Sequence, residues 1–178
     1  MNIGLFGLSG VGKTYLASKF VERRTDFVLT RASKLIKEGN QEIRYKYLDE
    51  CKVNRNQFAL IKGFELFKKN HPNQNIIIEL HNLIETPNGP IIIERYVFDE
   101  LELDAVCFIA RSPKDILIQR KLDETRERSS VSELDIDSYQ CKALELFQMY
   151  FMEFKTSRIC ILNSPSETEL DEFIRRSM

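Results

Sequence analysis

Eight consecutive residues near the start of the chain, Gly7-Leu8-Ser9-Gly10-Val11-Gly12-Lys13-Thr14, match the pattern G-x-x-x-x-G-K-[ST] in full. The glycines let successive backbone N–H groups converge on nucleotide phosphates, and a following helix adds its positive dipole. Lys13 would reach the β- and γ-phosphates, and Thr14 would offer its hydroxyl to Mg²⁺. We therefore predict a site for ATP and Mg²⁺, with nucleotide contacts from Gly7, Ser9, Gly10, Val11, Gly12, Lys13, Thr14 and Tyr15.

An acidic residue follows an apolar run in the middle of the chain. Glu79 comes directly after Ile76-Ile77-Ile78, and a carboxylate at the end of such a strand can orient Mg²⁺ through water. An ordinary acid at a strand end is the alternative. The chain has no Asn-Lys-x-Asp guanine signature, so a GTPase is disfavoured.

Three arginines lie within nine residues at the end of a predicted helix, namely Arg120, Arg126 and Arg128. Charge on a phosphoryl group in transfer spreads over its oxygens, and cations that close around it stabilise the transition state. A straight helix would not align all three, but a break near Thr125 could turn them to a common site. The alternative is that they are exposed and paired with neighbouring acids.

A basic stretch precedes residue 70. Between Lys19 and Lys69, lysines and arginines outnumber acids by 13 to 7, although the whole chain has a net charge of −1. Arg31 and Arg44, whose planar guanidinium groups can bind phosphate bidentately, are candidates to hold a phosphate acceptor, and Arg55 is a weaker one. His81 is a further candidate. The alternative is a solvated surface for the arginines and a satisfied strand-end histidine for His81.

Strands are predicted at 2–6, 27–29, 75–80, 105–110 and 158–162, separated by helices at 13–23, 31–38, 41–50, 54–70, 113–128, 135–154 and 167–176. Ser112 is expected to cap the helix that Pro113 begins. Residues 86–90 are expected to form a turn, and 91–103 are ambiguous between helix and strand. Alternating strands and helices predict an α/β fold of the P-loop NTPase type, with three α/β/α layers and a five-stranded, mainly parallel sheet.

Two segments resemble the nucleoside monophosphate kinases, in particular the archaeal-type adenylate kinases. Asp123-Glu124-Thr125-Arg126-Glu127-Arg128 is similar to the family's lid-entry run, and residues 81–89 are similar to its histidine and threonine-proline-x-glycine segment. The resemblance implies transfer of the ATP γ-phosphoryl group to a nucleotide. The chain length predicts one domain over 1–178. Within it we expect an acceptor-site helical region at about 30–70 and a short helical lid at about 123–137.

Departures from the family pattern fall mainly on the acceptor side. Glu79 stands where the family has an aspartate, residues 30–34 replace a glycine-aspartate element, and residues 90–95 replace a glycine- and proline-rich loop. The acceptor could therefore be a nucleotide or another small molecule. The alternative function is an ATP-binding switch or ATPase-like regulatory protein without small-molecule kinase activity.

Composition limits the remaining classes. With 43% hydrophobic residues, 7 glycines, 5 prolines and 4 cysteines, the chain is neither collagen-like, nor disordered, nor a disulfide scaffold. Near-neutral charge gives no reason to expect nucleic acid or a membrane as a partner, and nothing supports or excludes an oligomer. We expect a cytoplasmic protein, with Cys107 and Cys160 as small buried core residues inside apolar runs.

Overall fold

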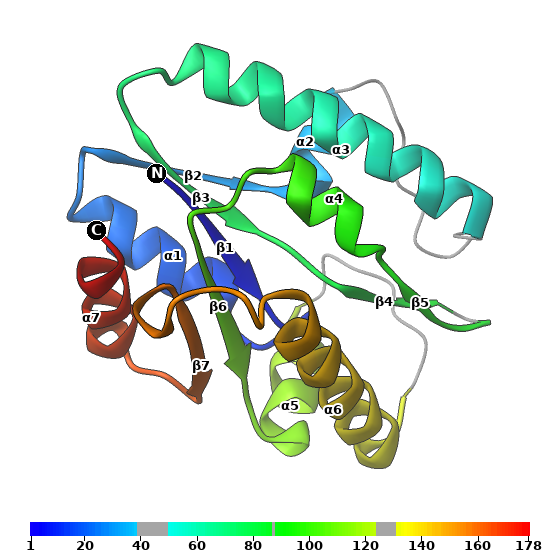
Figure 1. Cartoon of the computed structure of the whole chain (residues 1–178). Coiled ribbons are helices and arrows are strands. Elements are labelled where there is room, and N and C mark those ends of the chain that lie inside the picture. Colours follow the sequence, from blue (N-terminus) through cyan, green and yellow to red (C-terminus); the bar gives the residue numbers. More distant parts are fainter. Residues whose placement is uncertain (39–49, 87, 124–130) are drawn as a thin grey trace.

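A computed structural model describes residues 1–38, 50–86, 88–123 and 131–178 (Figure 1). Its main sheet has five parallel strands in the order β2-β3-β1-β6-β7. They are β1 (Asn2–Phe6), β2 (Phe27–Arg31), β3 (Asn75–Glu79), β6 (Ala105–Ala110) and β7 (Ile159–Asn163). β1 and its neighbours β3 and β6 are almost entirely buried, as expected of parallel strands covered on both faces. The predicted fold class and strand count are confirmed.

Helices cover both faces of this sheet (Figure 1). On one face α1 (Lys13–Glu22) lies beside α7 (Glu167–Ser177), and Arg23 donates hydrogen bonds to Glu167 and Asp171 there. On the other face lie α4 (Arg95–Glu100) and α6 (Glu133–Tyr150), which continue the aromatic core: Phe6 of β1 packs against Phe98 and Phe147 with ring centroids 5.1 and 5.4 Å apart. The aromatic side chains of α6 therefore belong to the core.

Two helices follow β2 and pack on each other. α2 (Ala32–Glu38) is short, whereas α3 (Glu50–Asn70) is the longest helix that the structure describes. Gly63 of α3 lies so close to α2 that an added Cβ would be 2.7 Å from the carbonyl oxygen of Leu35. The predicted helix at 41–50 falls almost wholly outside the described residues.

The segment after β3 differs from the sequence expectation. Two unpredicted strands, β4 (Leu83–Thr86) and β5 (Gly89–Ile92), form an antiparallel hairpin whose last pair, Thr86 with Gly89, lies within the predicted turn or loop at 86–90. The ambiguous stretch at 91–103 contains the end of β5 followed by α4. Asn82, which is buried, anchors the hairpin because its amide donates to the carbonyl of Ala143 on α6 over 2.7 Å. The hairpin thus has a fixed place beside the main sheet.

α5 (Pro113–Leu122) begins as predicted. Ser112 accepts a hydrogen bond from the amide of Asp115, and Pro113 occupies the first turn. The helix ends at Leu122, short of the predicted end near Arg128, and Asp123 is no longer helical, with φ −91° and ψ 86°. Most of the predicted lid lies outside the described residues. Before β7 the chain makes a short 3-10 turn, Thr156–Arg158. Among the described residues, no helix has the length and apolar character needed to cross a bilayer.

The cysteine expectation holds for one residue and is wrong for the other. Cys107 is fully buried in β6. Cys160, however, is partly exposed, because it lies on β7, which is an edge strand with a neighbouring strand, β6, on one side only.

Candidate nucleotide site

The glycine-rich segment forms a loop between the end of β1 and the start of α1. Gly7, Gly10 and Gly12 all have positive φ, at 135°, 93° and 95°, which side-chain-bearing residues rarely adopt. Leu8 and Val11 are buried and fasten the loop to the core. The loop therefore has the backbone that phosphate binding requires, held in place by its own apolar residues.

Lys13 curls back over this loop. Its side chain is buried, and Nζ donates to the carbonyls of Gly7 (2.7 Å) and Leu8 (3.0 Å). A buried ammonium that contacts backbone oxygens is fixed as a positive charge inside the loop. The predicted phosphate-binding lysine thus lies where an anion cradled by the loop would meet it.

Thr14 and Glu79 are brought together as the sequence predicted. The Thr14 hydroxyl donates to Oε2 of Glu79 over 2.7 Å, and Glu79 is almost buried at the end of β3. A hydroxyl beside a carboxylate is a hard oxygen donor set of the kind that Mg²⁺ prefers. These two residues therefore fit the predicted magnesium role.

His81 also reaches the loop, where one ring nitrogen contacts the loop backbone. Its Nδ1 lies 2.8 Å from the carbonyl oxygen of Gly7, and because a carbonyl can only accept, Nδ1 carries the proton. That contact supports the loop backbone. It places His81 under the phosphate site and leaves its predicted part in acceptor binding as a prediction.

Arg120 is the one predicted lid arginine within the described residues, and it lies over the loop. Its Nε donates to the carbonyl of Ser9 (2.9 Å), while Nη1 and Nη2 donate to the two carboxylate oxygens of Glu85 at 2.8 and 2.5 Å. The Arg120 side chain is 6% exposed and that of Glu85 is 21% exposed. Glu85 was not predicted as a site residue, because no strand was predicted around it.

Arg111 is a second site residue that the sequence reasoning missed. It follows β6 directly, and a Cβ added to Gly12 would lie 3.6 Å from its Nη2. Its backbone is clamped by the side chain of Gln140, which accepts from the Arg111 amide (3.1 Å) and donates to its carbonyl (3.0 Å). Its Nε is buried and has no hydrogen-bond partner in the described part of the chain. The available signal was its position after a buried strand next to β1.

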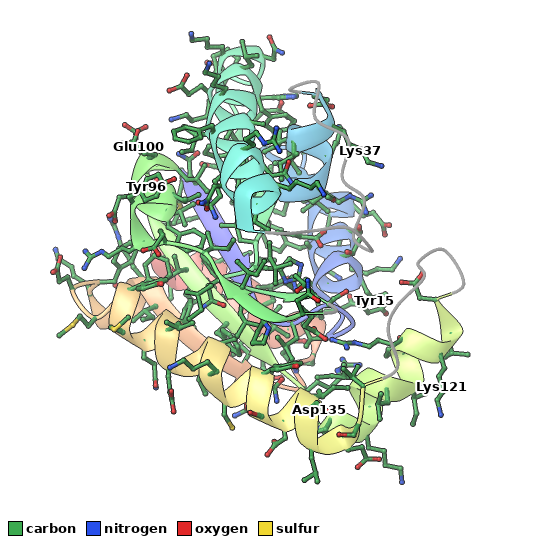
Figure 2. All side chains as sticks on the ribbon, turned by 90° about the vertical axis from the view of Figure 1, so that its right-hand side faces the viewer. Tyr15, Lys37, Tyr96, Glu100, Lys121 and Asp135 are labelled. Atoms are coloured by element: carbon green, nitrogen blue, oxygen red, sulfur yellow. The ribbon has the colours of Figure 1, made fainter. Side chains whose placement is uncertain are left out.

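The remaining predicted residues have exposed side chains or lie outside the described residues. The Tyr15 phenol is exposed and donates to Glu167 over 3.0 Å, a bond that raises the pKa of Tyr15, so only its backbone could serve the nucleotide. Figure 2 shows Tyr15 on the opposite side of the molecule from Tyr96 of α4. Arg31 is exposed at the end of β2, in register with Glu79. Arg44, Arg126 and Arg128 lie outside the described residues.

Comparison with known proteins agrees with this geometry. The sequence pattern of the AAA domain family matches residues 6–137. The adenylate kinase of Sulfurisphaera tokodaii is 29% identical over 147 residues, covering 75% of each chain. The adenylate kinase of Methanocaldococcus jannaschii is 25% identical over 158 residues, covering 76% of this chain and 75% of the relative.

Solved structures share the fold. Deoxyadenosine kinase of M. mycoides, with dCMP and a flexible dCDP bound, superposes with a TM-score of 0.57 at 16% identity, covering 98% of this chain and 97% of that one. Shikimate kinase of Bacteroides thetaiotaomicron superposes with a TM-score of 0.58 at 14% identity, covering 99% and 95%. The chain therefore belongs to the AAA domain family, as a P-loop kinase that is distantly homologous to the archaeal adenylate kinases.

Proposed function

We propose that this protein transfers the γ-phosphoryl group of ATP to a small acceptor, in the manner of the nucleoside monophosphate kinases. The observation that carries the proposal is the position of Arg120. Its guanidinium lies over the phosphate loop and donates a hydrogen bond to the carbonyl of Ser9. A cation in this position can stabilise the negative charge that develops on a phosphoryl group during transfer. A protein that only holds ATP does not need this second cation.

The described residues supply the donor side of such a reaction. The loop amides and Lys13 bind the triphosphate, and Arg120 stabilises the negative charge on the γ-phosphoryl oxygens. The acceptor oxygen forms a bond to the γ-phosphorus while the bond from that phosphorus to the β–γ bridging oxygen breaks, releasing ADP. Thr14 and Glu79 would hold Mg²⁺, which neutralises charge between the β- and γ-phosphates when bound.

A nucleotide is the proposed acceptor, because the sequence relatives are adenylate kinases. One of the structural neighbours is a deoxyadenosine kinase and another a shikimate kinase, so hydroxyl acceptors belong in the same screen. Arg31, at the end of β2 and exposed, is the described candidate to meet an acceptor phosphate, together with Arg44. Arg126 and Arg128 would close over the transferring group from the lid.

The test is ADP release from ATP and Mg²⁺ with nucleoside monophosphates, nucleosides and small hydroxyl acceptors. We expect one acceptor class to raise the rate well above that of ATP alone. Lys13→Ala should abolish ATP binding and turnover, whereas Lys19→Ala, which removes an exposed lysine of the same helix, should change neither. If ATP binds through Lys13 but no acceptor accelerates ADP release, the chain is an ATP-binding switch and the kinase proposal fails.

A further inference from the structure

Two cysteines far apart in sequence lie side by side at the edge of the main sheet. Cys107 of β6 and Cys160 of β7 are register partners on adjacent parallel strands, so their side chains lie on the same face. Neighbouring strands are separated by about 4.8 Å, within the Cα span of about 4.4–6.8 Å that a disulfide can bridge. The backbone therefore permits a bond between these two sulfurs.

The two thiols have complementary environments. Cys107 is fully buried, and burial raises the pKa of its thiol. The Cys107 S–H donates a hydrogen bond to Cys160, and the Arg176 guanidinium approaches the Cys160 sulfur at 4.0 Å. Together these contacts lower the pKa of Cys160 to about 6. One member of the pair is thus a thiolate nucleophile and the other a protonated neighbour.

Cys160 is also within reach of small molecules. It borders a surface hollow of about 520 Å³ between β7 and α7, whose other lining residues are Leu162, Glu169, Glu172, Phe173, Arg175 and Arg176. Cys141 on α6 is exposed as well. Exposure alone therefore does not distinguish Cys160 from Cys141. What distinguishes Cys160 is the Cys107 thiol and the Arg176 guanidinium beside it.

We propose that Cys160 is a site of oxidation by hydroperoxides, resolved by Cys107 to an interstrand disulfide. The Cys160 thiolate attacks the terminal peroxide oxygen, so that an S–O bond forms, the O–O bond breaks and the alkoxide or hydroxide leaves with a proton as alcohol or water. Cys107 sulfur then attacks the Cys160 sulfenic sulfur. The S–S bond forms, the S–O bond breaks, and the hydroxyl leaves as water with the Cys107 proton. The proposal is independent of the kinase activity.

The experiment uses the full chain with Cys51 and Cys141 replaced by serine, so that only the pair remains. After treatment with one equivalent of hydrogen peroxide, we expect the intact mass to fall by two hydrogens. Trypsin should then release one linked peptide containing Cys107 and Cys160, which dithiothreitol separates. A chain that keeps both thiols while a separate Cys141-only variant is oxidised at the same peroxide concentration overturns the proposal.

Single variants separate the two chemical steps. Cys107→Ala should stop at a sulfenic acid on Cys160 that dimedone captures, and Cys160→Ser should leave Cys107 unmodified. Arg176→Ala should slow oxidation several-fold, whereas Arg175→Ala, its neighbour in the same hollow, should not. If Cys107→Ala does not fold, the parent chain is oxidised in the presence of dimedone and sampled over time. A dimedone adduct on Cys160 that forms before the disulfide supports the proposal. Disulfide with no dimedone-trapped precursor at Cys160, or equal effects of the two arginine variants, contradicts the assignment.

Discussion

Arg120 and Glu85 face each other with both carboxylate oxygens bonded to the two terminal nitrogens of the guanidinium, at 2.8 and 2.5 Å. The pair joins α5 to the β4–β5 hairpin next to the phosphate loop. Because Arg120 also donates to the carbonyl of Ser9, Glu85 fixes the direction from which this cation meets the loop.

Replacing Glu85 by alanine should therefore lower turnover more than ATP affinity. Without its carboxylate partner the Arg120 side chain is no longer held in one orientation, and a charged hydrogen bond of this kind is worth about 1.5–3 kcal/mol. We expect kcat for ADP release to fall about tenfold or more. Glu100→Ala, an exposed acid on α4, is the matched control. Equal kcat in the Glu85 and Glu100 variants would make the pair purely structural.

The hydrogen bond between Thr14 and Glu79 leads to a separate prediction about magnesium affinity. Thr14→Ala removes the hydroxyl that donates to Glu79, whereas Thr14→Ser keeps it. Loss of a group that holds a metal or orients its ligands costs about 10- to 100-fold in metal affinity. A Mg²⁺ titration of ADP release should therefore shift to higher concentration by that factor in the alanine variant only. A shift of the same size in the serine variant would rule out the hydroxyl as its cause.

Arg111 should contribute to nucleotide affinity although it lies outside the loop motif. Its Nε is buried and has no hydrogen-bond partner among the residues that the structure describes, and an anionic oxygen would satisfy it. Arg111→Ala should weaken ATP binding about tenfold, which corresponds to about 1.4 kcal/mol. Calorimetric titration with ATP measures this, and Lys114→Ala, an exposed lysine in the first turn of α5, should bind as the parent does. Unchanged affinity in Arg111→Ala would assign the residue to packing.

The sequence predicted the parts of this site that are local in the chain. The eight-residue loop, Lys13 and Thr14 lie in one continuous motif, and Glu79 follows an apolar run that only a buried strand explains. Glu85 and Arg111 could not be found in this way, because each acquires its role from a neighbour far away in sequence. Glu85 needs Arg120, 35 residues later, and Arg111 needs the glycine loop about a hundred residues earlier.

The difference between local and long-range signals also explains which strands and helices the sequence failed to predict. β1 and β6 were predicted with their exact bounds, because runs of four and six consecutive apolar residues between loops indicate buried parallel strands. β4 and β5 have four residues each, and β5 contains Pro90, which argues against a strand except at an edge. α4 contains Val97 and Phe98, which do not favour a helix intrinsically; packing of Phe98 on Phe6 outweighs that preference.

Gly63 offers a test of how tightly the helices after β2 pack. In an isolated helix, glycine to alanine stabilises by about 1 kcal/mol. Here the added Cβ would lie 2.7 Å from the backbone oxygen of Leu35, so α2 and α3 must separate. We expect Gly63→Ala to lower the free energy of unfolding by about 1–3 kcal/mol in urea denaturation. Glu65→Ala, on the exposed side of α3, should not destabilise, and a Gly63 variant as stable as that control would show that the helices can move apart freely.

Cys160 provides a prediction about pH. Its lowered pKa of about 6 arises first from the Cys107 hydrogen bond and then from Arg176, against desolvation that raises it. The charged and titratable groups around it are Cys107 on β6 and, on α7, Glu169, Glu172, Arg175 and Arg176. Because the thiolate and not the thiol is alkylated, Cys160 should stay reactive as the pH falls from 8, lose half of its reactivity near pH 6 and lose the rest below that value.

Measuring iodoacetamide alkylation by peptide mass spectrometry at a series of pH values checks this directly. The half-maximal rate for Cys160 should lie near pH 6, whereas an exposed thiol without such partners titrates near about 8.5. Cys141, an exposed thiol on α6, is followed in the same sample as the internal control. Cys107→Ala should move the Cys160 midpoint upward, since the donated hydrogen bond that favours the thiolate is gone. A Cys160 profile that coincides with that of Cys141, in the parent chain and in the variant alike, would mean that the neighbouring thiol and Arg176 do not stabilise the thiolate.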